Sequence, residues 1–461
     1  MRSPLDGVRS GVEGVTWPPL VEGDTATMLA LARHLEASQW HDADAIAPRQ
    51  LGQLAVLAPW LADHSPAFAR RLGAAGLAPQ DLATPEGLAA LPVVDRRWFR
   101  EQADVDCDRV PPGHEPVGTN VTSGSTGEFI RVRRTRVCQL VWLAMMLRDH
   151  AWRQTDFAVP LATAKAPSPG IRRYPNWGAP ANLLYDTGPA LVLPVSLPGG
   201  EMLELLAGFE TGNLLIYPNA LRALIDAAEA RGARLANLRA IRTVGEVVDE
   251  RLRERVRAVL GVTVSDAYTS QEAGYIALEC PDTGLYHVMA EALIVEVLRA
   301  DGTPCSEDET GTVVITDLHN HATPVVRYAL GDLAEVGGSC ACGRGLPTVR
   351  RIIGRSRNLI LMPGGERVWP SLGGFGPDGY LHVLPILQFQ VQQTEADRLE
   401  IRLVTERPLT PAEEAIIADR TRRSLGHPFR LAFRYFDGRL PLPPSGKFED
   451  FICLVQPAAR D

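Results

Sequence analysis

Long apolar runs, a surplus of basic residues and a dense set of cysteines are all missing from this chain of 461 residues. No segment approaches the run of about 20 apolar residues that crosses a bilayer. The first residues, MRSPLDGVRSGVEG, contain no apolar stretch typical of a signal peptide. We therefore expect a cytoplasmic protein that has no membrane partner. Seven cysteines in so long a chain do not suggest a disulfide framework, so any clustered cysteines are better candidates for metal binding.

The charge and the length narrow the class of protein further. A net charge of -8 argues against nucleic acid as a partner, because phosphate backbones require a basic surface. A hydrophobic content of 45% is ordinary for a globular protein that can bury a core. The chain is longer than the size at which a single hydrophobic core keeps growing. We therefore expect a large domain and a smaller one, in a monomer or homodimer.

Hydrophobic periodicity changes twice along the chain. Residues 24–106 carry apolar side chains at three- and four-residue spacing, which predicts a helical N-terminal layer. From about 120 to 335, short β-rich runs alternate with helical ones, which predicts an α/β fold with parallel crossovers. The remainder has β-β-α-β character. We therefore predict a large domain of mixed sheets and helices over residues 1–355 and a small α+β domain over residues 356–461.

One short segment, TSGSTG at 122–127, combines two glycines with four hydroxyl side chains. Glycine is favoured where the backbone bends tightly or approaches a ligand. Successive backbone N–H groups in such a loop can surround phosphate oxygens. The segment lacks the closing Gly-Lys-Ser/Thr of a P-loop NTPase, and taken alone it is also typical of a tight hairpin turn.

Six segments, in this order, carry a resemblance to a known family. They are TSGSTGE at 122–128, TVGE at 243–246, SDAYTSQEAG at 265–274, TPVVRYALGDLAEV at 323–336, RRIIGRSRN at 350–358 and LPPSGKFED at 442–450. The chain from about residue 80 resembles the adenylate-forming (acyl-CoA synthetase) superfamily. Its resemblance is strongest to the phenylacetate-CoA ligase-like branch, which includes CapK-like proteins.

This resemblance implies ATP-dependent activation of a carboxylate, with pyrophosphate as the leaving group. Such a site must hold three phosphates, Mg²⁺ and a developing negative charge. Glu272 is similar to the glutamate that coordinates Mg²⁺, a metal that prefers hard oxygen ligands. The outer phosphates are expected in a loop formed by Ser123, Gly124, Ser125, Thr126 and Gly127.

The resemblance also implies where the nucleoside binds. Tyr268 is similar to the aromatic residue that packs on adenine, and Asp266 and the Gly245-Glu246 pair resemble residues around the adenine edge. Without the resemblance, a tyrosine at the end of a β-rich run is usually a core residue.

The ribose and the catalytic lysine complete the expected site. Asp332 is similar to the aspartate that accepts hydrogen bonds from both ribose hydroxyls, and Arg355 to the arginine that assists it. Lys447 is similar to the lysine that the C-terminal domain delivers to bridge carboxylate and α-phosphate. Arg357 lies where the superfamily has the hinge about which that domain rotates.

The chain departs from the superfamily pattern at two places. The usual Tyr-Gly-x-Thr-Glu is replaced by residues 268–272, so the amide of Gln271 stands where a threonine hydroxyl approaches the α-phosphate. Gln271 can still donate to a phosphate oxygen. Glu128 and Phe129 replace the proline that commonly follows the phosphate loop.

Two ligand pairs suggest a structural zinc ion. Cys340 and Cys342 lie one residue apart, and Cys280 is followed at short distance by His287. Three thiolates and an imidazole would complete a closed tetrahedral site, which resembles the zinc-binding cysteines of some phenylacetate-CoA ligase relatives. The alternative is a set of buried thiols and a core histidine.

The expected substrate is a small, aromatic or polar carboxylic acid, since the stretch from Lys165 to Gly188 is too polar for a fatty-acyl tunnel. The expected acceptor is the thiol of CoA or of a carrier protein. Two alternatives stay open from the sequence: adenylation of another oxyacid such as nitrite with transfer to an amine, and nucleotide binding without catalysis.

Overall fold

The computed structural model describes residues 7–121, 130–166, 168, 170–355, 358–368, 384–441 and 448–455. The chain forms two compact units, Met1–Ile353 and Gly354–Asp461. Within the described residues, no helix is both long enough and apolar enough to cross a membrane.

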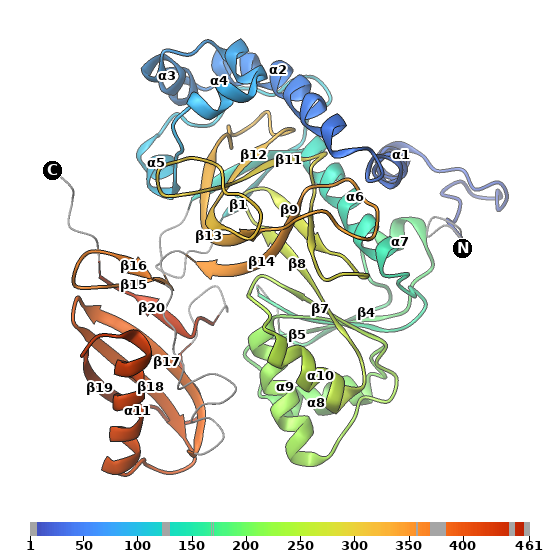
Figure 1. Cartoon of the computed structure of the whole chain (residues 1–461). Helices are drawn as coiled ribbons and strands as arrows, with labels where there is room; N and C mark the ends of the chain where they lie inside the picture. The colour runs from blue at the N-terminus through green and yellow to red at the C-terminus, as the bar shows by residue number, and fades with distance from the viewer. Residues whose placement is uncertain are drawn as a thin grey trace. The chain divides into compact units, whose positions relative to one another are not determined.

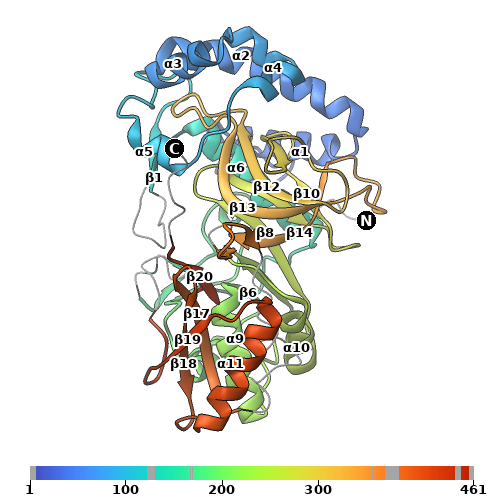
Figure 2. The same ribbon diagram turned by 60° about the vertical axis from the view of Figure 1, so that its left-hand side comes forward.

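The first unit begins with the expected helical layer, drawn in blue in Figures 1 and 2. Serine, threonine or aspartate side chains cap three of its helices, because their oxygens accept the first free backbone N–H groups. Leucines of this layer pack with Leu318 and Val326 of the sheet region. The elements are α1 Gly23–Ser38, η1 Ala43–Ala45, α2 Ile46–His64, α3 Pro66–Ala75, η2 Pro79–Ala83, α4 Pro85–Ala90 and α5 Arg96–Glu101.

A 12-stranded sheet follows, in the order β11-β12-β13-β14-β10-β9-β8-β7-β6-β3-β5-β4. Its parallel part pairs β5, β3, β6, β7 and β8 in that order. The strands are β3 Leu161–Ala164, β5 Ala190–Leu193, β6 Asn213–Ile216, β7 Ala240–Val244 and β8 Val264–Ser270; the edge strand β4 Arg172–Tyr174 is antiparallel. Helices α8 Gly199–Gly208, α9 Pro218–Arg231 and α10 Glu250–Leu260 form the crossovers and pack together (Figure 1).

The other part of the sheet is antiparallel among β8–β9–β10–β14 and β11–β12–β13. The expectation of parallel crossovers as far as residue 335 is therefore wrong after β8, because turns rather than helices connect these strands. The strands are β9 Gly274–Glu279, β10 Tyr286–Val288, β11 Leu293–Leu298, β12 Thr310–Asp317, β13 Tyr328–Val336 and β14 Thr348–Arg355. Helix α6 Arg136–Trp152 packs against α1 and β9, and α7 spans Ala181–Leu184.

The second unit contains the β-β-α-β pattern expected from the sequence. Its sheet has the order β19-β18-β17-β20, and α11 begins with a capping box formed by Thr410 and Glu413. The bounds are β15 Ile360–Leu361, β16 Arg367–Val368, β17 Ile386–Glu395, β18 Arg398–Thr405, α11 Pro411–Leu425, β19 Arg430–Tyr435 and β20 Phe451–Cys453.

Candidate active site and metal centre

The parallel strands end at one edge of the sheet, and several predicted site residues follow these ends. Gly245 and Glu246 come directly after β7, and Gln271 and Glu272 directly after β8. Ligands of open α/β sheets bind outside the carboxyl ends of the strands. The fold therefore puts these four residues where a nucleotide is expected.

Glu272 is buried, and only one of its two carboxylate oxygens forms polar contacts with other described residues. Its Oε1 lies 3.3 Å from Nη2 of Arg96 and 3.4 Å from the Tyr328 hydroxyl. Among the residues that the structure describes, Oε2 has no hydrogen-bond partner. A hard, ionised oxygen with a free coordination position is a suitable ligand for Mg²⁺, so the carboxylate fits the predicted role.

The predicted phosphate loop, with Ser123, Gly124, Ser125, Thr126 and Gly127, lies outside the described residues. The strands that it joins, β1 Val117–Val121 and β2 Arg131–Thr135, pair in antiparallel fashion from Val117↔Thr135 to Val121↔Arg131. The two flanking strands are thus described, and the role of the segment between them stays a prediction.

Both strands of this hairpin are attached to the end of β8. Asn120 Nδ2 donates to the Gln271 carbonyl over 3.1 Å, and Arg134 Nη1 donates to the Glu272 carbonyl over 3.0 Å. Arg134 of the basic strand β2 therefore ties this hairpin to the predicted magnesium ligand. The Gln271 side chain is exposed.

Tyr268 and Asp332 meet although they come from distant strands. The Tyr268 hydroxyl donates to Asp332 Oδ2 over 2.7 Å, and both residues are buried. In the sheet order, strands β14, β10 and β9 lie between β8 and β13. In a flat sheet, β8 and β13 would therefore be about 19 Å apart. The sheet therefore curves, and it brings the residues predicted for adenine and ribose into contact.

The other predicted nucleoside residues have partners within the protein. Asp266 accepts hydrogen bonds from Thr243 Oγ1 at 2.6 Å and from the Tyr286 hydroxyl at 2.9 Å, and burial raises the pKa of its carboxyl group. Glu246 Oε2 accepts from the backbone N–H of Asn219, near the start of α9. Gly245 has φ of 80°, which suits glycine.

Three predicted residues belong to the C-terminal part of the chain. Arg355 is the last residue of β14 and belongs to the second compact unit. Lys447 and Arg357 lie outside the described residues. The roles of all three stay predictions.

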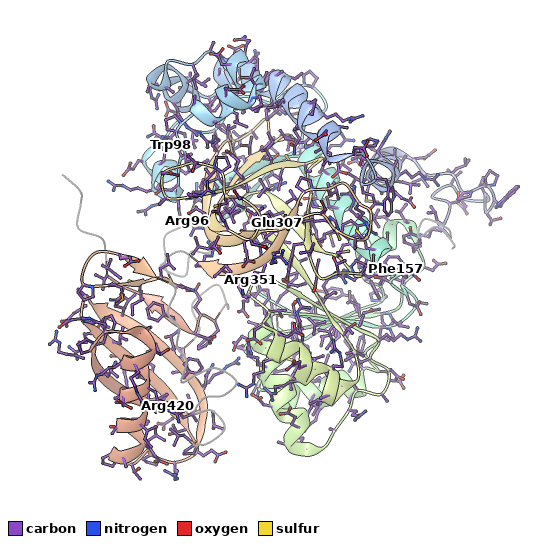
Figure 3. All side chains as sticks on the ribbon, in the orientation of Figure 1. Arg96, Trp98, Phe157, Glu307, Arg351 and Arg420 are labelled. Carbon is purple, nitrogen blue, oxygen red and sulfur yellow. The ribbon has the colours of Figure 1, made fainter. Side chains whose placement is uncertain are left out.

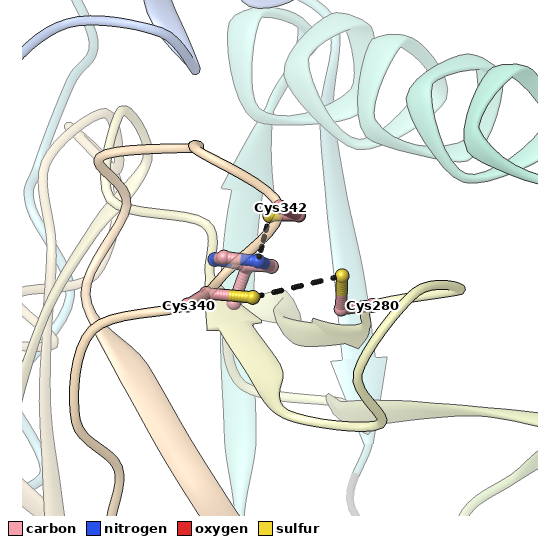
Figure 4. Close-up of side chains that lie close together, drawn as sticks. Cys280, Cys340 and Cys342 are labelled. Atoms are coloured by element: carbon pink, nitrogen blue, oxygen red, sulfur yellow. Dashed lines mark hydrogen bonds between the residues drawn. The ribbon is translucent and has the colours of Figure 1, made fainter.

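The four predicted zinc ligands converge, and Figure 4 shows the three cysteines together. The ligand atoms of Cys280, His287, Cys340 and Cys342 all lie within 4.8 Å of one another. Cys340 Sγ is 3.8 Å from Cys280 Sγ, and Cys342 Sγ is 3.3 Å from His287 Nε2. Tetrahedral zinc with bonds of about 2.3 Å separates two sulfurs by about 3.8 Å, so the arrangement fits that metal.

The surroundings of this cluster suit a metal site as well. His287 Nδ1 lies 3.4 Å from the Leu346 carbonyl, a contact that leaves Nε2 to face the cysteines. Burial lowers the pKa of His287 to about 4, which keeps the imidazole neutral at pH 7. The guanidinium of Arg344 lies 4.0 Å from Cys280 Sγ and places a positive charge beside the cluster.

The segment expected to bind the acid contributes to an aromatic cluster. Phe157, labelled in Figure 3, stacks on Tyr185 at 4.7 Å between ring centroids. It also meets Trp177 edge-to-face at 5.4 Å. Tyr185 and Trp177 therefore pack against a ring of the protein itself. Arg173 lies over Phe209 at 5.5 Å.

Reasoning from the sequence missed Arg96, Tyr328 and Arg134 as residues around Glu272. Arg96 and Arg134 carry no motif of their own, and they stand 176 and 138 residues from Glu272. Tyr328 is part of the quoted segment TPVVRYALGDLAEV, four residues before Asp332. That spacing on one strand was the only available signal, because alternate residues of a strand share a face.

Comparison with known proteins gives a consistent answer. No protein-family model matches the chain. Phenylacetate-coenzyme A ligase of Escherichia coli (strain K12) is 25% identical over 376 residues, which cover 77% of this chain and 82% of the relative. The enzyme of the same name from Pseudomonas putida is 25% identical over 351 residues, 73% of this chain and 76% of the relative.

Solved structures share the fold at lower identity. A crystal structure of 2-hydroxyisobutyryl-CoA ligase with 2-HIB-AMP superposes with a TM-score of 0.67 at 18% identity, covering 88% of each chain. An anthranilate CoA ligase with anthranoyl-AMP superposes with a TM-score of 0.52 at 14% identity, covering 79% of this chain and 74% of that one. The predicted fold class is confirmed, and these similarities agree with the predicted superfamily and ligase class. The chain is similar to phenylacetate-CoA ligases over about three quarters of its length and shares the fold of adenylate-forming CoA ligases.

Proposed function

We propose that this protein uses ATP and Mg²⁺ to adenylate a small carboxylic acid, and then transfers the acyl group to CoA. One observation carries the proposal. Two contacts between a phenol and a carboxylate, Tyr268 with Asp332 and Tyr328 with Glu272, join the end of β8 to β13. They gather the residues expected for adenine, ribose and Mg²⁺ in one place. CoA ligases among the relatives and acyl-AMP complexes among the structures of like fold support the reaction class.

The proposal assigns one chemical role to each group of residues. Ser123, Ser125, Thr126 and the adjoining glycines surround the outer phosphates, and Gln271 donates to the α-phosphate. Lys447 neutralises the reacting carboxylate and α-phosphate during adenylation. Bound Mg²⁺ would supply charge neutralisation at the phosphates through Glu272.

The decisive experiment is ATP–pyrophosphate exchange with a panel of benzoates, cinnamates, short acids and nitrite. At least one carboxylic acid is expected to stimulate exchange. Lys447→Ala is expected to lower it about 100-fold or more while ATP binding, measured by calorimetry, stays unchanged. Lys447→Arg keeps the positive charge but changes the head group, so it tests whether charge alone supports exchange.

Two results would count against the proposal. Stimulation by nitrite alone would favour transfer to an amine. No stimulation by any acid, together with normal ATP binding, would favour a nucleotide-binding protein without catalysis.

The ribose assignment predicts a selective effect on ATP. Asp332→Asn is expected to raise KM for ATP about tenfold, because a charged acceptor of two hydroxyl hydrogen bonds becomes neutral. The asparagine oxygen can still accept from Tyr268, so the fold is preserved. KM for the acid, measured at saturating ATP, is expected to change little. An equal rise in both KM values would contradict a ribose contact.

We also propose that Cys280, His287, Cys340 and Cys342 bind one structural zinc ion. All four coordination positions would be filled by protein, which leaves no position for substrate. Three thiolates and one imidazole give the site a net charge of about -1 with zinc bound, and Arg344 is placed to balance it.

A further inference from the structure

The carboxylate of Glu272 already has a cationic partner from the chain itself. Arg96, labelled in Figure 3, is the first residue of α5, and its Nη2 lies 3.3 Å from Glu272 Oε1. The side chain of Glu272 is 6% exposed and that of Arg96 is 21% exposed. Water and salt therefore screen this pair much less than a surface ion pair.

Backbone pairing sets the position of Arg96. Val94 donates its N–H to the Arg327 carbonyl over 3.0 Å and accepts from the N–H of Ala329 over 2.8 Å. These bonds form a parallel bridge between Val94 and Tyr328. Tyr328 is the residue whose hydroxyl approaches Glu272, so Arg96 and Tyr328 reach the same oxygen from paired segments.

Two buried arginines hold the segment before Arg96 in place. Arg327 Nη1 donates to the Leu91 carbonyl over 2.7 Å, and Arg71 Nη2 donates to the Pro92 carbonyl over 2.6 Å. Arg71 also donates to the Val326 carbonyl over 2.8 Å, which ties α3 to the residues just before β13. The helical N-terminal layer therefore does more than cover the sheet, since it delivers a guanidinium to the predicted magnesium ligand.

We propose that Arg96 is a positioning residue that neutralises Glu272 in the metal-free site, and that Arg96 and the divalent metal compete for this carboxylate. The inference rests on the proposed role of Glu272. An ionised carboxylate without a counter-charge is costly to bury, and Arg96 supplies that charge. Its contact to Oε1 also leaves Oε2 open to a cation.

The first test measures metal binding without nucleotide or activity. Mn²⁺ is titrated into the full-length protein and free Mn²⁺ is followed by electron paramagnetic resonance. Arg96→Gln is expected to bind Mn²⁺ about five- to tenfold more tightly than the parent, because a competing cation is gone. Arg97→Gln is the matched control, since Arg97 is 81% exposed and pairs with Glu101 on its own helix. Equal affinities in the two variants would overturn the inference.

The second test measures the magnesium dependence of exchange. Arg96→Gln is expected to reach half of its own maximal rate at a lower Mg²⁺ concentration than the parent, with a maximal rate about tenfold lower. Arg96→Lys, which keeps the charge, is expected to restore the parent's magnesium dependence. A lower rate with unchanged magnesium dependence would show a merely structural residue and overturn the inference.

The outcomes separate the two hypotheses. If no acid stimulates exchange in the parent, the proposed function fails, and the Mn²⁺ titration still decides whether Arg96 competes for Glu272. If the parent is active, and Arg96→Gln matches Arg97→Gln in Mn²⁺ affinity and the parent in magnesium dependence, the inference alone fails.

Discussion

Glu272→Gln is expected to lower the maximal rate of ATP–pyrophosphate exchange by about 100-fold or more. The amide keeps the size and hydrogen-bonding reach of the side chain but loses the negative charge that a magnesium ligand needs. The rate is measured at saturating ATP and acid over a range of Mg²⁺ concentrations.

Glu204→Gln provides the control, since Glu204 lies on α8 with a side chain 69% exposed and pairs with Arg231 at the surface. It is expected to exchange at the parental rate. Thermal unfolding of both variants checks that the fold is intact. A Glu272→Gln protein that unfolds like the parent and keeps more than half of its exchange rate would remove Glu272 from the magnesium site.

Removing the zinc ligands is expected to have the largest effect on stability. The Cys340→Ser, Cys342→Ser double variant is expected to purify without zinc and to unfold about 5–10 °C below the parent, because metal binding free energy contributes to folding free energy. The parent is expected to hold one zinc ion per chain by elemental analysis. Exchange activity at low temperature should change little, since the proposed metal is structural.

Cys305→Ser is the matched control, because Cys305 lies outside the cluster and is partly exposed. It is expected to keep zinc and the parental unfolding temperature. A parent protein without zinc after growth in zinc-supplemented medium would contradict the metal assignment. The same holds if the double variant and the control unfold at one temperature.

The fold was predictable where neighbouring residues carry the signal. Strands β5 to β8 alternate with helical patterns, and an apolar helix between two strands requires a parallel crossover. After β8 the runs LIVEVL and TVVITDL have no helix between them, which indicates the antiparallel pair that they form in the structure. The curvature of the sheet has no local signal, because it depends on twist summed over many strands.

Some residues of the candidate site could likewise be identified from local sequence, and others could not. Tyr268 and Glu272 lie on one short segment, so a linear motif identifies both. The spacing of Cys280 and His287 suits a pair of metal ligands. The second pair, Cys340 and Cys342, comes from one other loop. Arg96 reaches Glu272 only because Val94 pairs beside β13, and pairing between segments more than 200 residues apart follows from tertiary structure alone.

The loop that carries Cys340 and Cys342 also holds the end of α1. Gly345 donates its N–H to the Gln39 carbonyl over 3.0 Å, and Arg344 Nε donates to Gln39 Oε1 over 3.0 Å. These partners are separated by about 300 residues in the chain. During synthesis α1 leaves the ribosome first, yet its docking surface is complete only after three quarters of the chain has followed. At 5–20 residues per second, the end of α1 waits on the order of 15–60 s for this loop, so these contacts form late in synthesis.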